Sequence, residues 1–223
     1  MNPLDQSVVT GESRPSRILI ADDHSIVRVG LSVLLRNIVN HVHIEEAIDG
    51  NEVVKALGSA SFDLLVLDMN MPNTESFSLT RYIRAAFPLL KILIFTINKE
   101  AFFAKRCLRM GVHGYVIKQG GEAEVKDAIR AILQGHSYFS DTLIEIVSNE
   151  LIGATKHNPF ERLSDREFEL VLQILKGHTV TEVATTLHMT ESTVRTHKSR
   201  IMKKLKLSGP LSLMDLARQH SII

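Results

Sequence analysis

Hydrophobic residues recur along this chain with two different patterns, and the change of pattern divides the chain into two parts. From residue 17 to about 134, apolar runs too short for a helix alternate with segments whose apolar residues recur every three or four positions. The runs predict strands at 17–21, 41–47, 62–68, 91–96 and 114–117, and the segments predict helices at 24–37, 51–57, 76–87, 100–110 and 122–133. Five strand–helix units predict an α/β domain at 17–135, with a five-stranded parallel, doubly wound sheet covered by helices on both faces.

The second part of the chain shows no strand pattern. Helical periodicity at 141–151, followed by an aperiodic stretch that ends near Pro159, predicts a linker at 136–160 that contains a short helix. Beyond it, Ser164 with Glu167 forms a capping box that begins one helix, Thr179 or Thr181 begins a second, Thr190 a third and Pro210 a fourth. Residues 161–223 are therefore predicted to be an all-α domain of four short helices.

Composition narrows the class of protein. Hydrophobic residues make up 44% of the chain, enough to bury cores, but no run of eighteen apolar residues occurs and residues 1–17 lack the apolar segment of a signal peptide. We therefore expect a cytoplasmic protein without membrane contact. The single cysteine, Cys107, excludes an internal disulfide, and its helical spacing from Ala104 and Leu108 predicts a small apolar core residue. The ten histidines show no spacing typical of zinc ligands.

Charge is distributed unevenly. Residues 1–154 carry 15 Lys and Arg against 18 Asp and Glu, whereas residues 155–223 carry 11 against 7. The basic balance of the second part favours an anionic partner there.

Polar residues follow the predicted strands at the points where they end. Asp22 and Asp23 follow the first strand, Asp68 ends the third, Thr96 ends the fourth and Lys118 follows the fifth. Because the carboxyl ends of parallel strands share one edge of the sheet, we expect these side chains to meet there. Clustered carboxylates raise each other's pKa unless a cation lies among them, and ligands that are all oxygen favour Mg²⁺.

Asp68 is best interpreted as a nucleophile toward phosphorus, because a metal ion reduces the repulsion between a carboxylate and a phosphoryl group. Lys118 would place a second positive charge beside the phosphoryl oxygens, and Thr96 would donate a hydrogen bond. Neither a glycine-rich nucleotide loop nor a Ser-His-Asp arrangement is present in the sequence.

The order of these residues along the chain points to a known family. The residues concerned are Asp22, Asp23, Asp68, Met71, Pro72, Thr96, Tyr115 and Lys118. They resemble the receiver domain of bacterial two-component response regulators, a flavodoxin-like fold, over about residues 17–135. The resemblance implies that Asp68 accepts a phosphoryl group from the histidine of a sensor kinase or phosphotransfer protein. It also implies that Mg²⁺ is bound by Asp23, Asp68 and the backbone carbonyl of Asn70, with Asp22 acting mainly through water, and that Thr96 and Tyr115 form a switch pair.

Two positions depart from the receiver pattern. The family usually has glycine at the position of Ser76, and a small residue where this chain has Ile97. Ser76 predicts a different loop conformation after the metal site. Ile97 is expected to alter the rates of phosphorylation and dephosphorylation.

The segment 190–207 is predicted to be a basic helix. It carries six Lys or Arg and one acid, and Val194, Ile201 and Leu205 are spaced to form its buried stripe. A basic face on a short helix, preceded by a small helix and a turn, is what a major-groove reader requires. The alternative is a solvated amphipathic helix with ion pairs between residues four apart, which the shortage of acids disfavours.

Residues 160–220 are similar to the LuxR/NarL-type helix-turn-helix. The similarity rests on Leu163-Ser164-Asp165-Arg166-Glu167, Gly177, Glu182-Val183-Ala184, Leu187 and Thr193-Val194-Arg195-Thr196-His197. It implies that 180–187 is the supporting helix and 191–205 the recognition helix. Arg195, Thr196 and Ser199 match base-facing positions, while Thr193, Lys198 and Lys203 are candidates for phosphate contacts.

Together these features predict a response regulator transcription factor that binds double-stranded promoter DNA, as a homodimer when active, under the control of Asp68 phosphorylation. One alternative is a regulator that keeps the receiver fold but binds DNA independently of phosphorylation. A second is an aspartyl phosphotransferase of the haloacid dehalogenase kind, which the presence of Asn70 two residues after Asp68, instead of a second acid, disfavours. We do not expect an enzyme with turnover.

Overall fold

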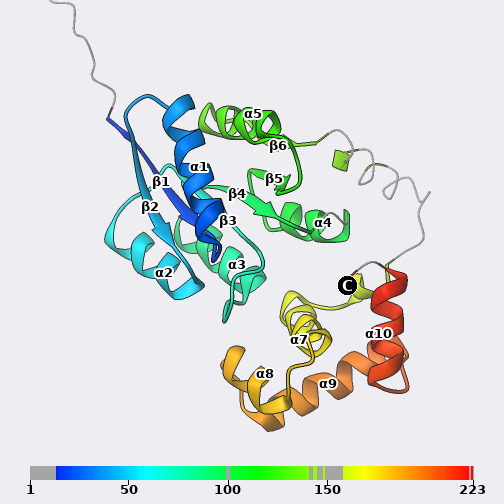
Figure 1. The fold of residues 1–223 in the computed structure, drawn as a ribbon. Coiled ribbons are helices and arrows are strands. Elements are labelled where there is room, and N and C mark those ends of the chain that lie inside the picture. The colour runs from blue at the N-terminus through cyan, green and yellow to red at the C-terminus, as the bar shows by residue number, and fades with distance from the viewer. Residues whose placement is uncertain are drawn as a thin grey trace, which may run out of the picture.

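The computed structural model describes residues 14–98, 101–140, 143–144, 148, 158–220 and 222. Its first part is a parallel sheet between two layers of helices (Figure 1). The elements of this part are β1 Ser16–Ala21, α1 Ser25–Ile38, β2 Val42–Ala47, α2 Gly50–Ser59, β3 Leu64–Leu67, α3 Ser76–Ala86, β4 Lys91–Thr96, α4 Ala101–Arg109, β5 Gly114–Ile117, α5 Glu122–Leu133 and β6 Tyr138–Phe139.

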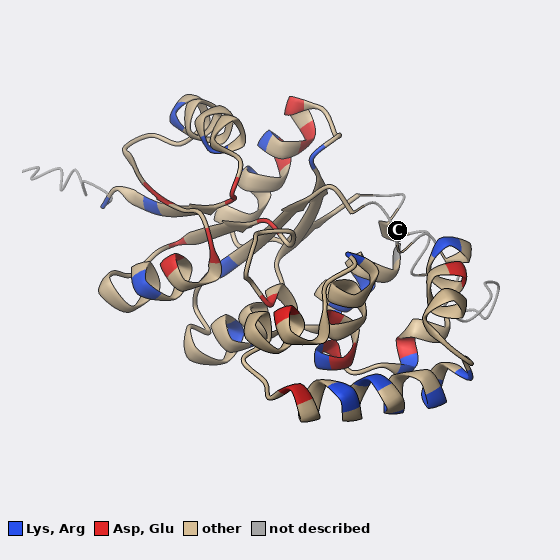
Figure 2. Ribbon diagram, turned by 60° about the horizontal axis from the view of Figure 1, so that its bottom comes forward, with Lys and Arg blue, Asp and Glu red and all other residues tan. Residues whose placement is uncertain are grey.

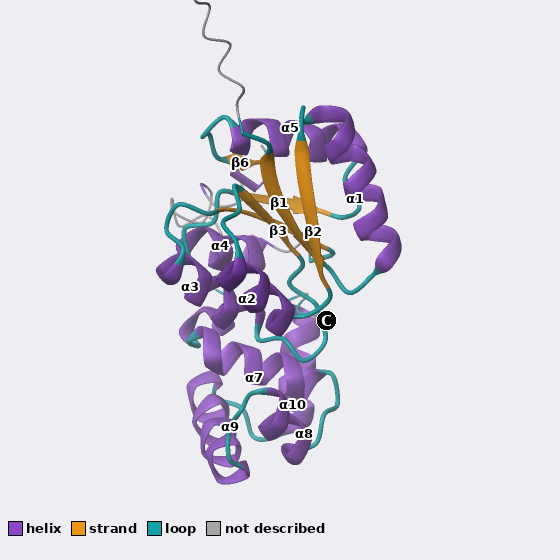
Figure 3. Cartoon of the chain, turned by 90° about the vertical axis from the view of Figure 1, so that its left-hand side faces the viewer, coloured by secondary structure: helices purple, strands orange, loops and turns teal. Residues whose placement is uncertain are grey.

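The strand order β2-β1-β3-β4-β5-β6 confirms the predicted doubly wound parallel sheet. Successive residues of each central strand point to opposite faces, so that both faces of the sheet need a cover. Leu65 and Leu67 pack with α2, α3 and α4, whereas Leu64 and Val66 pack with α1 and α5. Figure 3 shows the strands with helices on both sides of them. The packed layers position the carboxyl ends of β1, β3, β4 and β5, where the polar residues lie.

The sixth strand, β6, was not predicted from the sequence, which indicated five. Its two residues are too few for a recognisable period, and they follow Gly135 with a φ of +93°. Tyr138 pairs with Gly114 of β5, and a Cβ at Gly114 would lie only 3.0 Å from the backbone oxygen of Tyr138. The glycine therefore lets this extra strand approach the sheet.

The second part is helical, as predicted. It consists of a 3₁₀-helix η1 Pro159–Arg162, α7 Asp165–Leu175, α8 Val180–Thr186, α9 Glu191–Leu205 and α10 Pro210–Gln219. Ser164 and Glu167 form the predicted capping box of α7, and Thr179, with Glu182, caps α8 in the same way. The predicted helix at 141–151 falls mostly outside the described residues. Of the described helices, none is both long enough and apolar enough to span a lipid bilayer.

Candidate functional site

The structure brings the acidic residues of β1 and β3 together at the carboxyl edge of the sheet. Oxygen atoms of Asp22, Asp23 and Asp68 lie within 4.8 Å of one another. Lys118, directly after β5, reaches across to them: its Nζ lies 2.6 Å from Asp22 Oδ2 and 2.9 Å from Asp68 Oδ2. Asp22 and Asp68 are both only 1% exposed, so this single ammonium is shared by two carboxylates that water barely reaches and offsets only one of their two negative charges.

Burial shifts the ionisation of this cluster. Loss of water raises the pKa of Asp68 above its ordinary value, although the hydrogen bond and positive charge of Lys118 act in the opposite direction. Burial alone would lower the pKa of Lys118, but its contacts with Asp22 and Asp68 outweigh that effect and the pKa ends above its ordinary value. The Lys118 ammonium is therefore charged at neutral pH. The carboxylate cluster would be stabilised by a further positive charge.

The donor set fits Mg²⁺. All three aspartates offer hard oxygen ligands, and Asp23 is the most exposed of them, on the side open to solvent. Asp22 Oδ2 is buried and lacks a well-aligned hydrogen bond, despite its short distance to Lys118 Nζ. A hydrated divalent cation would supply the charge and the directed contacts that this atom lacks.

The predicted switch residues lie beside the acidic cluster. Thr96 is fully buried at the end of β4, and its Oγ1 accepts hydrogen bonds from Asn70 Nδ2 at 3.2 Å and from the backbone N–H of Asn98 at 3.3 Å. The backbone N–H of Asn70 also donates to Asp68 Oδ1, at 3.2 Å. Tyr115 is buried, and its hydroxyl donates to the backbone oxygen of Asn98 at 2.6 Å. One hydrogen-bonded chain thus joins Asp68 to Tyr115.

Two residues of this site were missed in the sequence analysis. His24 Nδ1 lies 2.9 Å from Asp23 Oδ1 and 3.3 Å from Asp22 Oδ1. Asn98 links Thr96 and Tyr115, as described above, and its side-chain Nδ2 also donates to Asn70 Oδ1 at 3.5 Å. Asn98 comes two residues after the end of β4 and His24 three residues after the end of β1, and this closeness to a strand end is the signal that could have identified them.

The two departures from the receiver pattern have different structural consequences. Ser76 is buried at the start of α3, and its Oγ donates to the backbone oxygen of Met69 at 2.8 Å, so this hydroxyl ties the helix to the loop after β3. Ile97 is 54% exposed, and its side chain is therefore not packed into the core beneath the acidic cluster. Its effect on reaction rates remains a prediction.

The basic helix α9 lies on the outer side of the helical part. Val194, Ile201 and Leu205 are buried, as their spacing predicted, and Figure 2 shows Lys and Arg positions recurring along the ribbon of this helix. Of the predicted contact residues, Arg195, Thr196, Ser199 and Lys203 are exposed, while Thr193 and Lys198 are half-buried. Arg200 is also exposed on this helix, and Lys204 pairs with Glu167 of α7 at 2.7 Å.

The fold and the two sites define a class: an α/β domain with a carboxylate cluster at its sheet edge, followed by a helix-turn-helix domain. Comparison with protein families agrees. Residues 18–130 match the response regulator receiver domain, and residues 161–217 match the bacterial regulatory proteins of the luxR family.

The similarity to individual relatives extends over nearly the whole chain. The oxygen regulatory protein NreC of Staphylococcus carnosus is 32% identical, over 93% of this chain and 99% of its own length. Response regulator UvrY of Escherichia coli is 30% identical, over 92% and 94% respectively. A solved structure of RcsB from Salmonella enterica serovar Typhimurium, bound to a promoter in the presence of the phosphomimetic BeF₃⁻, superimposes with a TM-score of 0.68 at 25% identity and covers 91% of this chain and 98% of that one. This chain belongs to the response regulators that carry a luxR-family domain.

Proposed function

We propose that this protein is a phosphorylation-controlled transcription regulator in which Asp68 accepts a phosphoryl group from the histidine of a sensor kinase or phosphotransfer protein. The observation that carries the proposal is the position of Asp68, beside Lys118 and among the carboxylates of Asp22 and Asp23. Phosphorylation would then control sequence-specific binding of promoter DNA by α9.

In the transfer step, one carboxylate oxygen of Asp68 attacks the phosphorus of the phosphohistidine. An O–P bond forms, the N–P bond breaks, and the released imidazole nitrogen keeps the electron pair and takes a proton from solvent. Lys118, now bonded to Asp68 Oδ2, would contact a phosphoryl oxygen. Asp23, Asp68 and the backbone carbonyl of Asn70 would hold Mg²⁺, with Asp22 acting mainly through water, and the ion would supply positive charge against the repulsion between carboxylate and phosphoryl oxygens.

Thr96 is suited to sense the phosphoryl group. Its Oγ1 already accepts two hydrogen bonds, so its own O–H is the donor that remains for a phosphoryl oxygen. Movement of this hydroxyl toward Asp68 would disturb the bonds to Asn70 and Asn98, and Asn98 is the residue that holds the hydroxyl of Tyr115. The state of Asp68 would thereby reach the surface near Asn98.

DNA binding is supported by the exposed face of α9 and by RcsB, which has been solved bound to a promoter in the presence of BeF₃⁻. We infer that Arg195, Thr196 and Ser199 face base edges and that Thr193, Lys198 and Lys203 contact phosphates. A homodimer would place two such helices on paired half-sites.

The test compares Asp68→Asn with Asp127→Asn, a substitution of the exposed Asp127 on α5. A radiolabelled phosphodonor such as acetyl phosphate should label the wild type and Asp127→Asn but not Asp68→Asn. Beryllofluoride should strengthen promoter binding by the first two proteins only. Label that persists in Asp68→Asn would contradict the assignment of the acceptor.

The promoter-binding measurement and an assay of phosphate-ester hydrolysis distinguish the alternatives. A regulator that binds DNA independently of phosphorylation would show equal affinity with and without beryllofluoride. A phosphotransferase of the haloacid dehalogenase kind would hydrolyse phosphate esters with multiple turnovers, and Asn70, whose side chain bonds Thr96, offers no acid for that reaction.

A further inference from the structure

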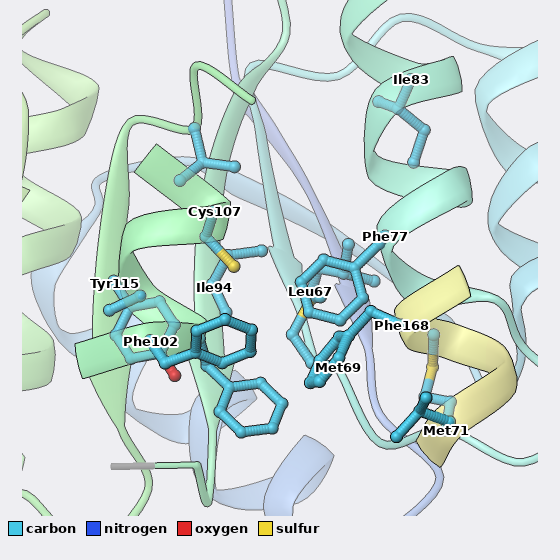
Figure 4. Close-up of a cluster of buried hydrophobic side chains, with 14 of the residues drawn as sticks. Leu67, Met69, Met71, Phe77, Ile83, Ile94, Phe102, Cys107, Tyr115 and Phe168 are labelled. Atoms are coloured by element: carbon cyan, nitrogen blue, oxygen red, sulfur yellow. The ribbon is translucent and has the colours of Figure 1, made fainter. Parts of the chain in front are cut away.

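The two domains are joined by a cluster of aromatic side chains. Phe168 of α7 is fully buried, and its ring lies against three phenylalanines of the receiver domain (Figure 4). The centroid distances are 4.8 Å to Phe102, 5.6 Å to Phe103 and 5.7 Å to Phe77. The buried residues of the helical domain and those on the α2, α3 and α4 side of the receiver sheet belong to one continuous hydrophobic cluster, whereas the α1 and α5 side of the sheet forms a second cluster. The contact therefore resembles the interior of a domain more than a transient interface.

Arg106 of α4 adds directed bonds to this contact. Its guanidinium donates to the backbone oxygens of Phe160 at 2.8 Å and Leu163 at 2.7 Å, and to Asp165 Oδ1 at 2.6 Å. The same group lies over the ring of Phe168, 4.7 Å from its centroid. These bonds fix the orientation of α7 relative to the receiver domain.

Glu169, the next residue of α7, occupies the amino terminus of α3 in the receiver domain. Its Oε1 accepts from the backbone N–H groups of Phe77 at 2.8 Å and Ser78 at 3.0 Å, and its Oε2 accepts from Ser78 Oγ at 2.8 Å. Glu75, the residue that precedes α3, makes no capping bond with its own side chain. The first turn of α3 is thus capped by a carboxylate from the DNA-binding domain.

The capped end of α3 is tied to the phosphoacceptor loop. Ser76, the first residue of α3, bonds the backbone oxygen of Met69, the residue directly after Asp68. A cavity of about 120 Å³ separates this loop from α7, and its lining includes Asn70 and Asn98 on one side and Glu169 on the other. Only the loop after β3 and the first turn of α3 thus lie between Asp68 and the carboxylate of Glu169.

We propose that Glu169 is a positioning residue that couples the phosphorylation state of Asp68 to the DNA-binding domain through the amino terminus of α3. The inference rests on the proposed function and names the route by which it is regulated. The phosphoryl group would rearrange the loop at Asn70, the loop would move the first turn of α3, and α3 would move α7 through its cap.

The cap would allow this joint two states, with the carboxylate bonded to α3 or released from it. Glu169 is only 3% exposed, and burial raises its pKa, so the ionised carboxylate depends on its three hydrogen bonds. A small shift of α3 would leave a buried charge without partners, so the carboxylate either follows the helix or leaves for water. In this way a change at Asp68 would alter the position of the DNA-binding domain, and DNA binding would in turn affect Asp68.

The experiment measures the ratio of promoter dissociation constants without and with beryllofluoride in the full-length protein. For the wild type, a ratio in the range usual for allosteric coupling is expected, about 5- to 150-fold. Glu169→Ala should bring the ratio close to 1, while beryllofluoride still binds at Asp68, as ¹⁹F NMR would show. Glu182→Ala is the matched control, because Glu182 caps a helix within the DNA-binding domain only. Its ratio should equal that of the wild type.

Two milder variants guard against a folding defect. In Glu169→Gln the side-chain oxygen still accepts both backbone N–H bonds, so the ratio should recover. Ser78→Ala removes one of the three bonds and should give an intermediate ratio. A wild-type ratio of 1 would contradict the proposed function itself. A wild-type ratio above 1 that Glu169→Ala leaves unchanged would overturn the coupling role and spare the proposed function.

Discussion

Lys118 is the positive charge on which the acidic cluster depends in this structure. Lys118→Ala would leave Asp22 and Asp68 buried without their shared partner. We expect it to lower the free energy of unfolding by about 3 kcal/mol, the usual scale for an uncompensated buried charge. Urea denaturation would measure the loss, and added Mg²⁺ should restore more stability to this variant than to the wild type.

Lys126→Ala is the control for this prediction. Lys126 pairs with Glu122 one turn away on α5, at a site where both side chains are solvated. Exposed pairs of this kind contribute about 0.5 kcal/mol or less. Equal losses in the two variants would mean that Lys118 is an ordinary surface lysine.

The raised pKa of Glu169 should make the free energy of unfolding depend on pH in a specific direction. Burial raises its pKa in the folded protein above the ordinary value of 4.5, although bonds from Ser78 and Phe77 oppose the shift. The folded state then binds more protons than the unfolded state between these two values, so this group's contribution is full below pH 4.5 and is lost as pH rises through the folded pKa.

Glu169→Gln lacks the ionisable group and isolates this effect. The free energy of unfolding of the wild type, minus that of the variant, should fall as pH rises from about 4.5 toward neutrality. Urea titrations of both proteins at a series of pH values would measure it, and the subtraction removes the other carboxylates. A difference that is flat, or that rises with pH, would contradict a raised pKa.

The individual residues of the acidic cluster could be predicted because strand ends determine their positions. Asp22, Asp23, Asp68, Thr96 and Lys118 follow apolar runs, and parallel strands bring such ends to one edge. The donors to Thr96, the side-chain amide of Asn70 and the backbone N–H of Asn98, could not be paired with its hydroxyl in this way. They lie in loops, where the conformation depends on contacts distant in sequence rather than on a period.

The bounds and the buried side of helix α9 could be predicted from the sequence of 190–207 alone, because this one segment contains both the apolar stripe and the basic face. Its contact residues predict two different mutational effects. Arg195→Ala should weaken specific binding by about 1–3 kcal/mol and relax the preference at one base position, since Arg195 is proposed to contact a base edge. The weak exposed pair of Arg195 with Glu191, at 3.3 Å, would not offset this.

Lys203→Ala serves as the contrast, because it should weaken binding to all sequences alike. It should also lower the slope of log affinity against log salt by about 1, since one phosphate contact releases about one counterion. Fluorescence anisotropy with specific and scrambled duplexes at several salt concentrations would separate the two patterns. If Arg195→Ala weakened both duplexes equally, that residue would be a phosphate contact.

The joint between the domains could not be predicted from the sequence. Phe168 reads as an ordinary core position of α7 and Glu169 as a solvated acid of the same helix, while their partners on α3 lie about ninety residues away. No period and no motif links positions so far apart in the chain. The packing of α7 on α3 and α4 arises only when both domains are folded. It means that movement or unfolding of one domain affects the other.

This dependence has a measurable consequence for unfolding. Phe168→Ala would remove a fully buried ring from the centre of the joint and should cost about 3–5 kcal/mol. In the wild type, loss of helical circular dichroism should coincide with the exposure of Cys107 to a thiol reagent, because Cys107 is fully buried in α4 beside the joint and burial raises its pKa. In Phe168→Ala the two curves should separate, since the domains no longer share a core.

Leu213→Ala is the matched control, because Leu213 is equally buried but lies on α10 within the helical domain. It should lower stability by about 2–5 kcal/mol and keep the two transitions coincident, since the joint is intact. Separate transitions already in the wild type would mean that the aromatic cluster does not unite the domains. Because the coupling proposed for Glu169 needs α7 to stay seated on α3, that result would also remove its mechanical basis.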